Sequence, residues 1–121
     1  MATLTAKITL VSTDLTTDSL SAETTNTLTL TEGGIIRKAI TGTGSGSAQT
    51  IAAASEYAVG TYMYVKNTDA TAGDYLIIRS SSADHIQLNA GEWAWFPWVT
   101  DADITVYTST GGTILEYGIF S

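Results

Sequence analysis

Alternation of apolar and polar residues is the main pattern of this chain. From Leu4 to Leu10 every second residue is apolar and the residues between are threonines and one lysine, which is the period of a strand with one buried face. The segment 25–32, TNTLTLTE, repeats the pattern. Two glycines follow it, and the segment 35–41, IIRKAIT, is therefore predicted to be its hairpin partner.

Short strands separated by turn residues continue to the C-terminus, and no segment has a convincing amphipathic helical period. The clearest are TYMYVKN, YLIIR, HIQL, WAWFPW, ITVYTS and ILEYGIF, of which the last two are predicted to form a closing hairpin. Residues 42–47, GTGSGS, are predicted to be a flexible linker. The pattern predicts an all-β fold with little or no helix, an antiparallel β-sandwich of the jelly-roll type. We expect a single domain over 1–121, with 1–11 as an edge strand or an interacting arm.

Composition narrows the classes of partner. Only 14% of the 121 residues are charged, and the net charge is −7, which disfavours nucleic acid and anionic membranes because such contacts depend on positive charge. The chain has no cysteine, which excludes disulfides and thiolate zinc sites. The N-terminal segment does not resemble a signal peptide, so we expect synthesis in the cytoplasm.

Candidate catalytic and metal-binding groups are sparse. The one histidine, His85, follows Asp84, and neighbouring residues of a strand point to opposite faces, so the two do not form a ready dyad. Asp69 with Asp74 around one turn and Asp101 with Asp103 in another could offer oxygens to calcium, but acidic residues that cap their own turns are the simpler interpretation. We therefore expect no enzyme activity, no metal and no cofactor.

The segment 91–99, GEWAWFPWV, contains all three tryptophans. On one strand, Trp93 and Trp95 would share a face with Pro97, and Trp98 would lie at or beyond the break made by the proline. Two interpretations stay open: part of this set belongs to the core, or its exposed members lie at a subunit interface or a sugar-binding surface. The predicted contact residues between subunits are Thr3, Leu4, Thr5 and Lys7 of the arm and the exposed members of Trp93, Trp95 and Trp98.

Three segments of the second half, YVKNTDAT (64–71), IQLNAGEWAWFPW (86–98) and ILEYGIF (114–120), resemble small β-rich virion proteins of tailed bacteriophages, notably cyanophages. The features that recur in that group are an xVKNxD strand end, an LxAGExxxxP turn and a C-terminal EYGxF. The resemblance covers roughly 57–121. It implies a non-enzymatic capsid decoration or cement protein on the surface of the virion, a homotrimer that contacts the major capsid protein or other virion proteins.

Two alternatives to that function remain. A carbohydrate-binding β-sandwich would stack Trp93 and Trp95 on sugar rings, with acidic side chains accepting hydrogen bonds from the sugar hydroxyls. An adhesion module associated with a tail or fibre is the other alternative.

Overall fold

The structure is a computed structural model that describes residues 1–15, 17 and 19–121. The chain divides into two compact units, Met1–Glu32 and Gly33–Ser121. The β-sandwich therefore begins at Gly33, whereas the expected domain began at residue 1. Each unit is described by itself below.

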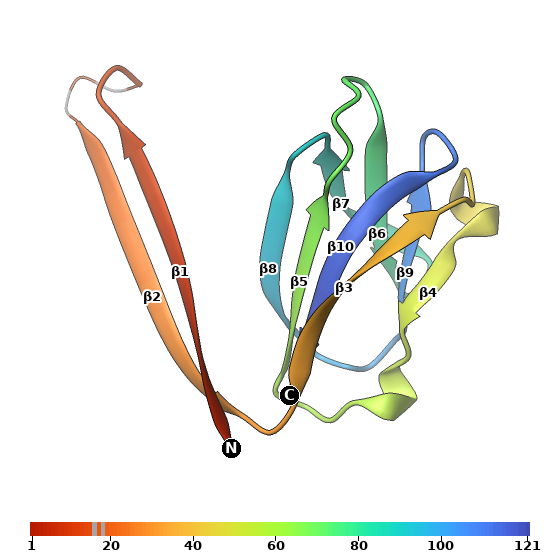
Figure 1. The fold of residues 1–121 in the computed structure, drawn as a ribbon, viewed down its shortest axis with the longest axis horizontal. Helices are drawn as coiled ribbons and strands as arrows, with labels where there is room; N and C mark the ends of the chain where they lie inside the picture. The colour runs from red at the N-terminus through yellow and green to blue at the C-terminus, as the bar shows by residue number, and fades with distance from the viewer. Residues whose placement is uncertain (16, 18) are drawn as a thin grey trace. The chain divides into compact units, whose positions relative to one another are not determined.

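The first unit is a β-hairpin of two long strands, β1 (Ala2–Ser12) and β2 (Leu20–Leu30) (Figure 1). They pair antiparallel without a register shift, from Ala2 opposite Leu30 to Ser12 opposite Leu20. The prediction that the second of these strands pairs with the segment after the two glycines was wrong. That segment belongs to the sandwich, where it pairs with the last strand of the chain.

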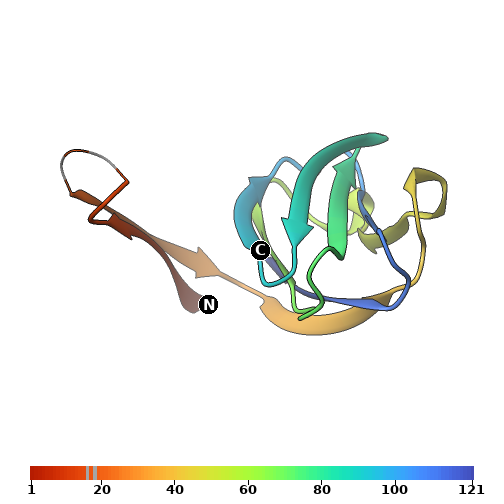
Figure 2. The ribbon, with the colours of Figure 1, turned by 90° about the horizontal axis from the view of Figure 1, so that it is seen from above.

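The second unit is built from eight strands in two four-stranded sheets, seen from two sides in Figure 1 and Figure 2. Two short 3₁₀ turns, η1 (Ser45–Ser47) and η2 (Ala54–Glu56), flank one of the strands. The strands are β3 (Gly33–Ile40), β4 (Gln49–Ala52), β5 (Thr61–Asn67), β6 (Tyr75–Ser80), β7 (Ala83–Asn89), β8 (Trp93–Trp98), β9 (Ile104–Thr108) and β10 (Thr113–Phe120).

The strand order is β3-β10-β5-β8 in one sheet and β4-β9-β6-β7 in the other. The eight strands of this unit are arranged as one long hairpin whose closed end is the β6–β7 turn. In it β6 pairs with β7, β5 with β8, β4 with β9 and β3 with β10. Rolling that hairpin into two layers gives a jelly roll. The predicted all-β sandwich is confirmed, but the predicted closing hairpin is wrong, because β9 and β10 lie in opposite sheets.

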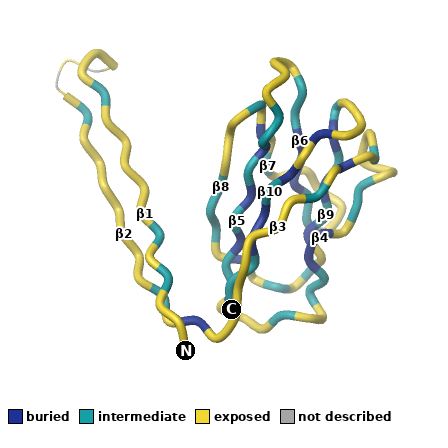
Figure 3. Tube along the Cα trace, viewed as in Figure 1, coloured by how far each residue is buried: buried dark blue, intermediate teal, exposed yellow. Residues whose placement is uncertain are grey.

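The core is formed by buried side chains from strands of both sheets, and Figure 3 marks the buried residues along the trace in dark blue. Strict alternation in β5 and β9 places every second side chain in it, and such alternation is what a sheet with one solvated face requires. Its fully buried apolar members include Ile40, Met63, Val65, Leu76, Ile78, Val106 and Leu115.

Trp98 is also a core residue, with only 6% of its surface exposed and its ring centroid 5.8 Å from that of Tyr57. The strand was expected to end near Pro97, and β8 ends one residue after it, at Trp98. Since β8 is an edge strand that pairs with β5 alone, a proline is tolerated where its missing N–H would face outward. Trp98 is accordingly removed from the predicted interface.

Residues 42–47 connect β3 to β4 and include η1; residues 43–47 are exposed, and the connection is anchored at Gly42. Gly42 O accepts a hydrogen bond from the Thr108 amide at 3.0 Å, and the amide of Gly42 lies 3.3 Å from Gln49 Oε1. A Cβ on Gly42 would overlap the Ser47 carbonyl oxygen. Glycine is therefore needed here for close approach of the backbone.

Candidate functional site

An aromatic surface covers the outer face of the sheet β3-β10-β5-β8. We call Tyr62, Tyr64, Trp93, Trp95 and Phe120 the aromatic face. Their strand neighbours in β5 are buried in the core, so alternation directs these side chains to the opposite side. The register sets Tyr64 opposite Trp95 and Tyr62 opposite Phe120. The sequence thus predicted the common face of Trp93 and Trp95.

Most of the aromatic face packs against itself. The ring of Trp95 stacks on Tyr62 at 5.6 Å with 14° between the planes, and it lies 5.6 Å from Phe120 at 43°. Gly118 makes room for this arrangement, because a Cβ there would come within 2.7 Å of the Phe120 ring. Trp95 is consequently half-buried, whereas Trp93 is 51% exposed. Trp93 is the tryptophan that is open to a partner.

A polar row lies beside the aromatic side chains. Arg37 Nε donates to Glu116 Oε2 at 2.8 Å, and the Tyr64 hydroxyl donates to the other carboxylate oxygen at 3.0 Å. The hydrogen bond from Arg37 lowers the pKa of the Glu116 carboxyl, while burial raises the pKa of Tyr64. Both effects keep this pair as an ionised carboxylate and a neutral phenol, which suits a fixed structural contact better than proton transfer.

The four arm residues predicted from the sequence lie on both faces of the hairpin. Leu4 stands opposite Leu28 on one face, and alternation places Thr3, Thr5 and Lys7 on the other. On that second face Lys7 Nζ lies 3.2 Å from the Glu23 carboxylate. A partner lying flat on one face would therefore contact Leu4 or the other three, but not all four.

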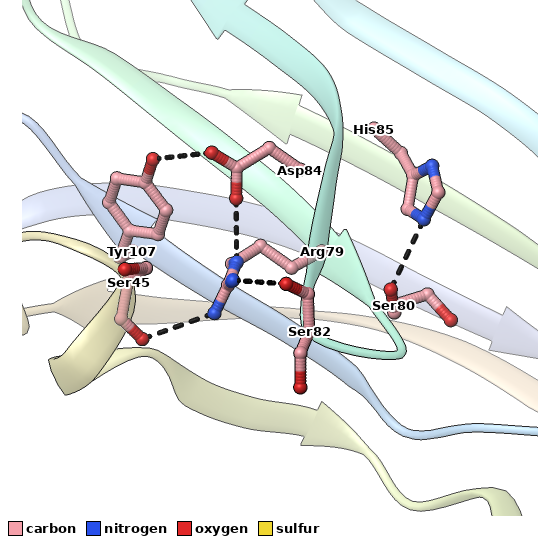
Figure 4. Close-up of polar contacts among 7 residues, drawn as sticks. All are labelled: Ser45, Arg79, Ser80, Ser82, Asp84, His85 and Tyr107. Carbon is pink, nitrogen blue, oxygen red and sulfur yellow. Dashed lines mark hydrogen bonds and ion pairs between the residues drawn. The ribbon is translucent and has the colours of Figure 1, made fainter.

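A hydrogen-bonded network centred on Arg79 was not found from the sequence (Figure 4). Arg79 Nε donates to Asp84 Oδ1 at 2.6 Å, and its other two nitrogens donate to the carbonyl oxygens of Ser45 and Ser82. The Tyr107 hydroxyl donates to Asp84 Oδ2 at 2.9 Å, which lowers the pKa of that carboxyl. The Arg79–Asp84 pair across the β6–β7 turn could be guessed from their spacing. Nothing in the sequence indicates that Tyr107 of β9 also binds Asp84.

His85 turns away from Asp84, as adjacent strand positions require. Figure 4 shows its ring beside Ser80, where Nε2 lies 3.1 Å from the carbonyl oxygen. Asp69 caps its own turn as predicted, because it accepts from the Thr71 amide at 2.8 Å. Asp103 does not: it accepts from the amide of Ala54 at 2.9 Å, far along the chain, and so ties its loop to η2. Among the described residues there is no cluster of three or more groups that could hold a metal ion. In the same part of the chain no helix is long and apolar enough to cross a membrane.

No family model, curated protein or solved structure matches this chain. Segments 64–71 and 86–98 meet at the end of β5 through hydrogen bonds of Asn67, which we call the latch. Asn67 is fully buried; its Nδ2 donates to Leu88 O at 3.0 Å and its Oδ1 accepts from the Asp69 amide at 2.9 Å. Its backbone bonds Gly91 and Glu92, each at 2.9 Å. The latch fixes the β7–β8 turn and hence the start of β8, where Trp93 lies.

Proposed function

We propose that this chain is a non-enzymatic structural subunit of a virion, a capsid decoration or cement protein that assembles as a homotrimer. The observation that carries the proposal is the β1–β2 hairpin, which pairs with no third strand among the residues that the structure describes. An isolated two-stranded hairpin is marginally stable at best in water. A hairpin of this length is therefore best explained as a segment that neighbouring subunits complete.

One face of the hairpin is suited to that role. Cross-strand pairs place Ala2, Leu4, Ala6, Ile8 and Leu10 of β1 on the same face as Leu20, Ala22, Leu28 and Leu30 of β2. We call this the apolar face. Leu10 is 57% exposed and Ile8 36%, so a neighbour that covered them would remove apolar surface from water.

Charge also favours contact through the apolar face. The chain carries a net charge of −7, so copies repel one another over most of their surface. The apolar face, all of whose residues the structure describes, contains no charged side chain. The ion pair between Lys7 and Glu23 lies on the other face of the hairpin. Copies of the chain can therefore meet at the apolar face without bringing like charges together.

That the assembly is a virion is inferred from the resemblance to phage virion proteins. Its segments form the latch and much of the aromatic face, which are parts of the sandwich scaffold. Within the proposal, the hairpin joins copies of the chain, and the exposed Trp93 contacts the major capsid protein. Aromatic side chains are enriched at the centres of such interfaces.

The test uses two adjacent substitutions on opposite faces of β1. Leu4→Glu places a charge on the apolar face, and Thr5→Glu places the same charge on the other. We expect Leu4→Glu to convert the trimer to monomer in native mass spectrometry and to lower the number of copies on gradient-purified phage particles by more than about tenfold. Thr5→Glu is the matched control and should retain both. A wild-type chain that is monomeric and absent from the purified particles would refute the proposal.

A glycan-binding function is a second candidate, favoured by the exposed Trp93 on a face that also carries the Arg37–Glu116 ion pair, with Lys66 between them in the register. It predicts saturable quenching of tryptophan fluorescence by an oligosaccharide and loss of the quenching in Trp93→Ala. Quenching that persists in that variant would count against a site at Trp93.

A further inference from the structure

The outer face of the sheet β3-β10-β5-β8 has a charge opposite in sign to that of the whole chain. The strand residues on this face alternate with the core residues, and three of them are charged: Arg37, Glu116 and Lys66. Two positive charges and one negative charge give the face a net charge of +1, whereas the chain carries −7. The acidic excess of the protein therefore lies entirely outside this face.

The three charged side chains and Trp93 stand in one row across the four strands. Arg37 is opposite Glu116, Glu116 is opposite Lys66, and Lys66 is opposite Trp93. Side chains directly opposite one another on a sheet are close enough to interact. The hydrogen bond from Arg37 lowers the pKa of the Glu116 carboxyl, and the positive charge of Lys66 lowers it further. This end of the aromatic face thus combines an indole with an ammonium group.

Lys66 is the charge in the row that is left for a partner. The two carboxylate oxygens of Glu116 are held by Arg37 Nε at 2.8 Å and by the Tyr64 hydroxyl at 3.0 Å. Among the residues that the structure describes, the ion pairs are formed by Lys7, Arg37 and Arg79, and Lys66 has none. A carboxylate brought by a partner would meet this ammonium group beside Trp93, which is 51% exposed.

The arrangement of the aromatic rings favours a protein over a sugar chain as that partner. A sugar chain binds by stacking on open ring faces, but Trp95 has one face stacked on Tyr62 and its edge against Phe120. Trp93 alone of the tryptophans on this face is open. The same face also exposes an aliphatic side chain, Ile35, at 57%. Exposed aromatic and aliphatic groups with a flanking charge are typical of protein–protein interfaces.

We propose that this face binds an acidic segment of another protein, with a carboxylate on Lys66 and an apolar side chain packed against Trp93. Because the rest of the chain repels acidic surfaces, the charge of this face also orients the approach of such a partner. The inference rests on the proposed function in one respect, since it takes the partner to be the major capsid protein. The binding chemistry itself can be tested without a capsid.

Three capped five-residue peptides test the chemistry on the full chain. Each has leucine at its second and fourth positions, and the other three positions are all glutamate, all glutamine or all lysine. The readout is the indole N–H signal of Trp93 in proton–nitrogen correlation spectra. We expect saturable shifts, with the glutamate peptide binding about two- to fivefold more tightly than the glutamine peptide and the lysine peptide binding most weakly. Raising the salt concentration from about 50 mM to about 500 mM should remove this preference, because salt screens exposed charges.

A pair of lysine variants separates Lys66 from the general charge of the protein. Lys66→Gln should abolish the preference for the glutamate peptide over the glutamine peptide. Lys38→Gln is the matched control, because it makes the same change of charge on the same sheet. Lys38 stands opposite the buried Leu115 and so lies on the other side of the sheet. This variant should keep the preference.

Four results would overturn the proposal. Equal affinity for the three peptides would show that charge does not select the partner, and a preference that survives Lys66→Gln would place the contact elsewhere. Tighter binding of alginate, an acidic polysaccharide, than of the glutamate peptide would make the partner a glycan. Dissociation of the oligomer in Lys66→Gln would make it a second copy of the chain. The peptide titrations involve neither the hairpin nor a phage particle, so their failure is distinguishable from a failure of the Leu4→Glu test.

Discussion

The latch around Asn67 allows a quantitative prediction. Replacing Asn67 by alanine removes the hydrogen bond to Leu88 O and the one from the Asp69 amide. Each is worth about 1 kcal/mol, and polar partners left in a buried site add about 1–3 kcal/mol. Because Asn67 is fully buried, water cannot replace these bonds. We expect Asn67→Ala to lower the free energy of unfolding of the sandwich by about 2–4 kcal/mol.

Urea denaturation followed by circular dichroism measures this loss. With a slope of roughly 1 kcal/mol per molar urea for a unit of this size, the midpoint should fall by about 2–4 M. Asn89→Ala is the matched control, because Asn89 is exposed and its side chain accepts one hydrogen bond from Gln87 at 3.0 Å. It should cost less than about 0.5 kcal/mol. Equal losses in the two variants would show that the latch does not hold the turn.

Three further predictions concern the sandwich. Gly118→Ala should destabilise it by about 1–3 kcal/mol in thermal unfolding, because the new methyl group would lie 2.7 Å from the Phe120 ring; an unchanged melting temperature would contradict this packing. Ser82→Gly should stabilise it by about 1 kcal/mol, because Ser82 has a φ of 64°, which costs a non-glycine residue energy; Ser80→Gly, at a position without positive φ, should not stabilise it. The hydrogen bond from Tyr107 lowers the pKa of Asp84 in the folded chain, so its contribution is present above the unfolded pKa and is lost as the pH falls below about 4. Asp84→Asn should therefore flatten the loss of stability in acid, and identical pH profiles would refute the role of this carboxylate.

Much of the fold could be predicted from local pattern, but the pairing of the strands could not. Alternation in β5 and in β10 showed which side chains face the core and which form the aromatic face. The partner of a strand is set by contacts far along the chain, and in a jelly roll most consecutive strands change sheets. The turn glycines before β10 therefore predict a hairpin, although the chain crosses from one sheet to the other there.

The candidate site was predictable to a similar degree. The exposure of Trp93 and the burial of Trp98 depend on β8 being an edge strand that runs through Pro97, and nothing local in the sequence shows this. The contact between Asp84 and Tyr107 likewise requires knowing that β9 lies beside β6, with β7 on the other side. The apolar face of the hairpin was visible as alternation in both strands, but their pairing was assigned differently.

The pairing of β3 with β10 has a practical consequence for engineering. Gly33 stands directly opposite Phe120, so the two ends of the sandwich unit adjoin. A few residues could join them covalently, and new ends could be opened at the exposed Ser81–Ser82 turn between β6 and β7. Such a circular permutant would retain every strand pair of the jelly roll and would carry any fused cargo at the far end of the long folded hairpin.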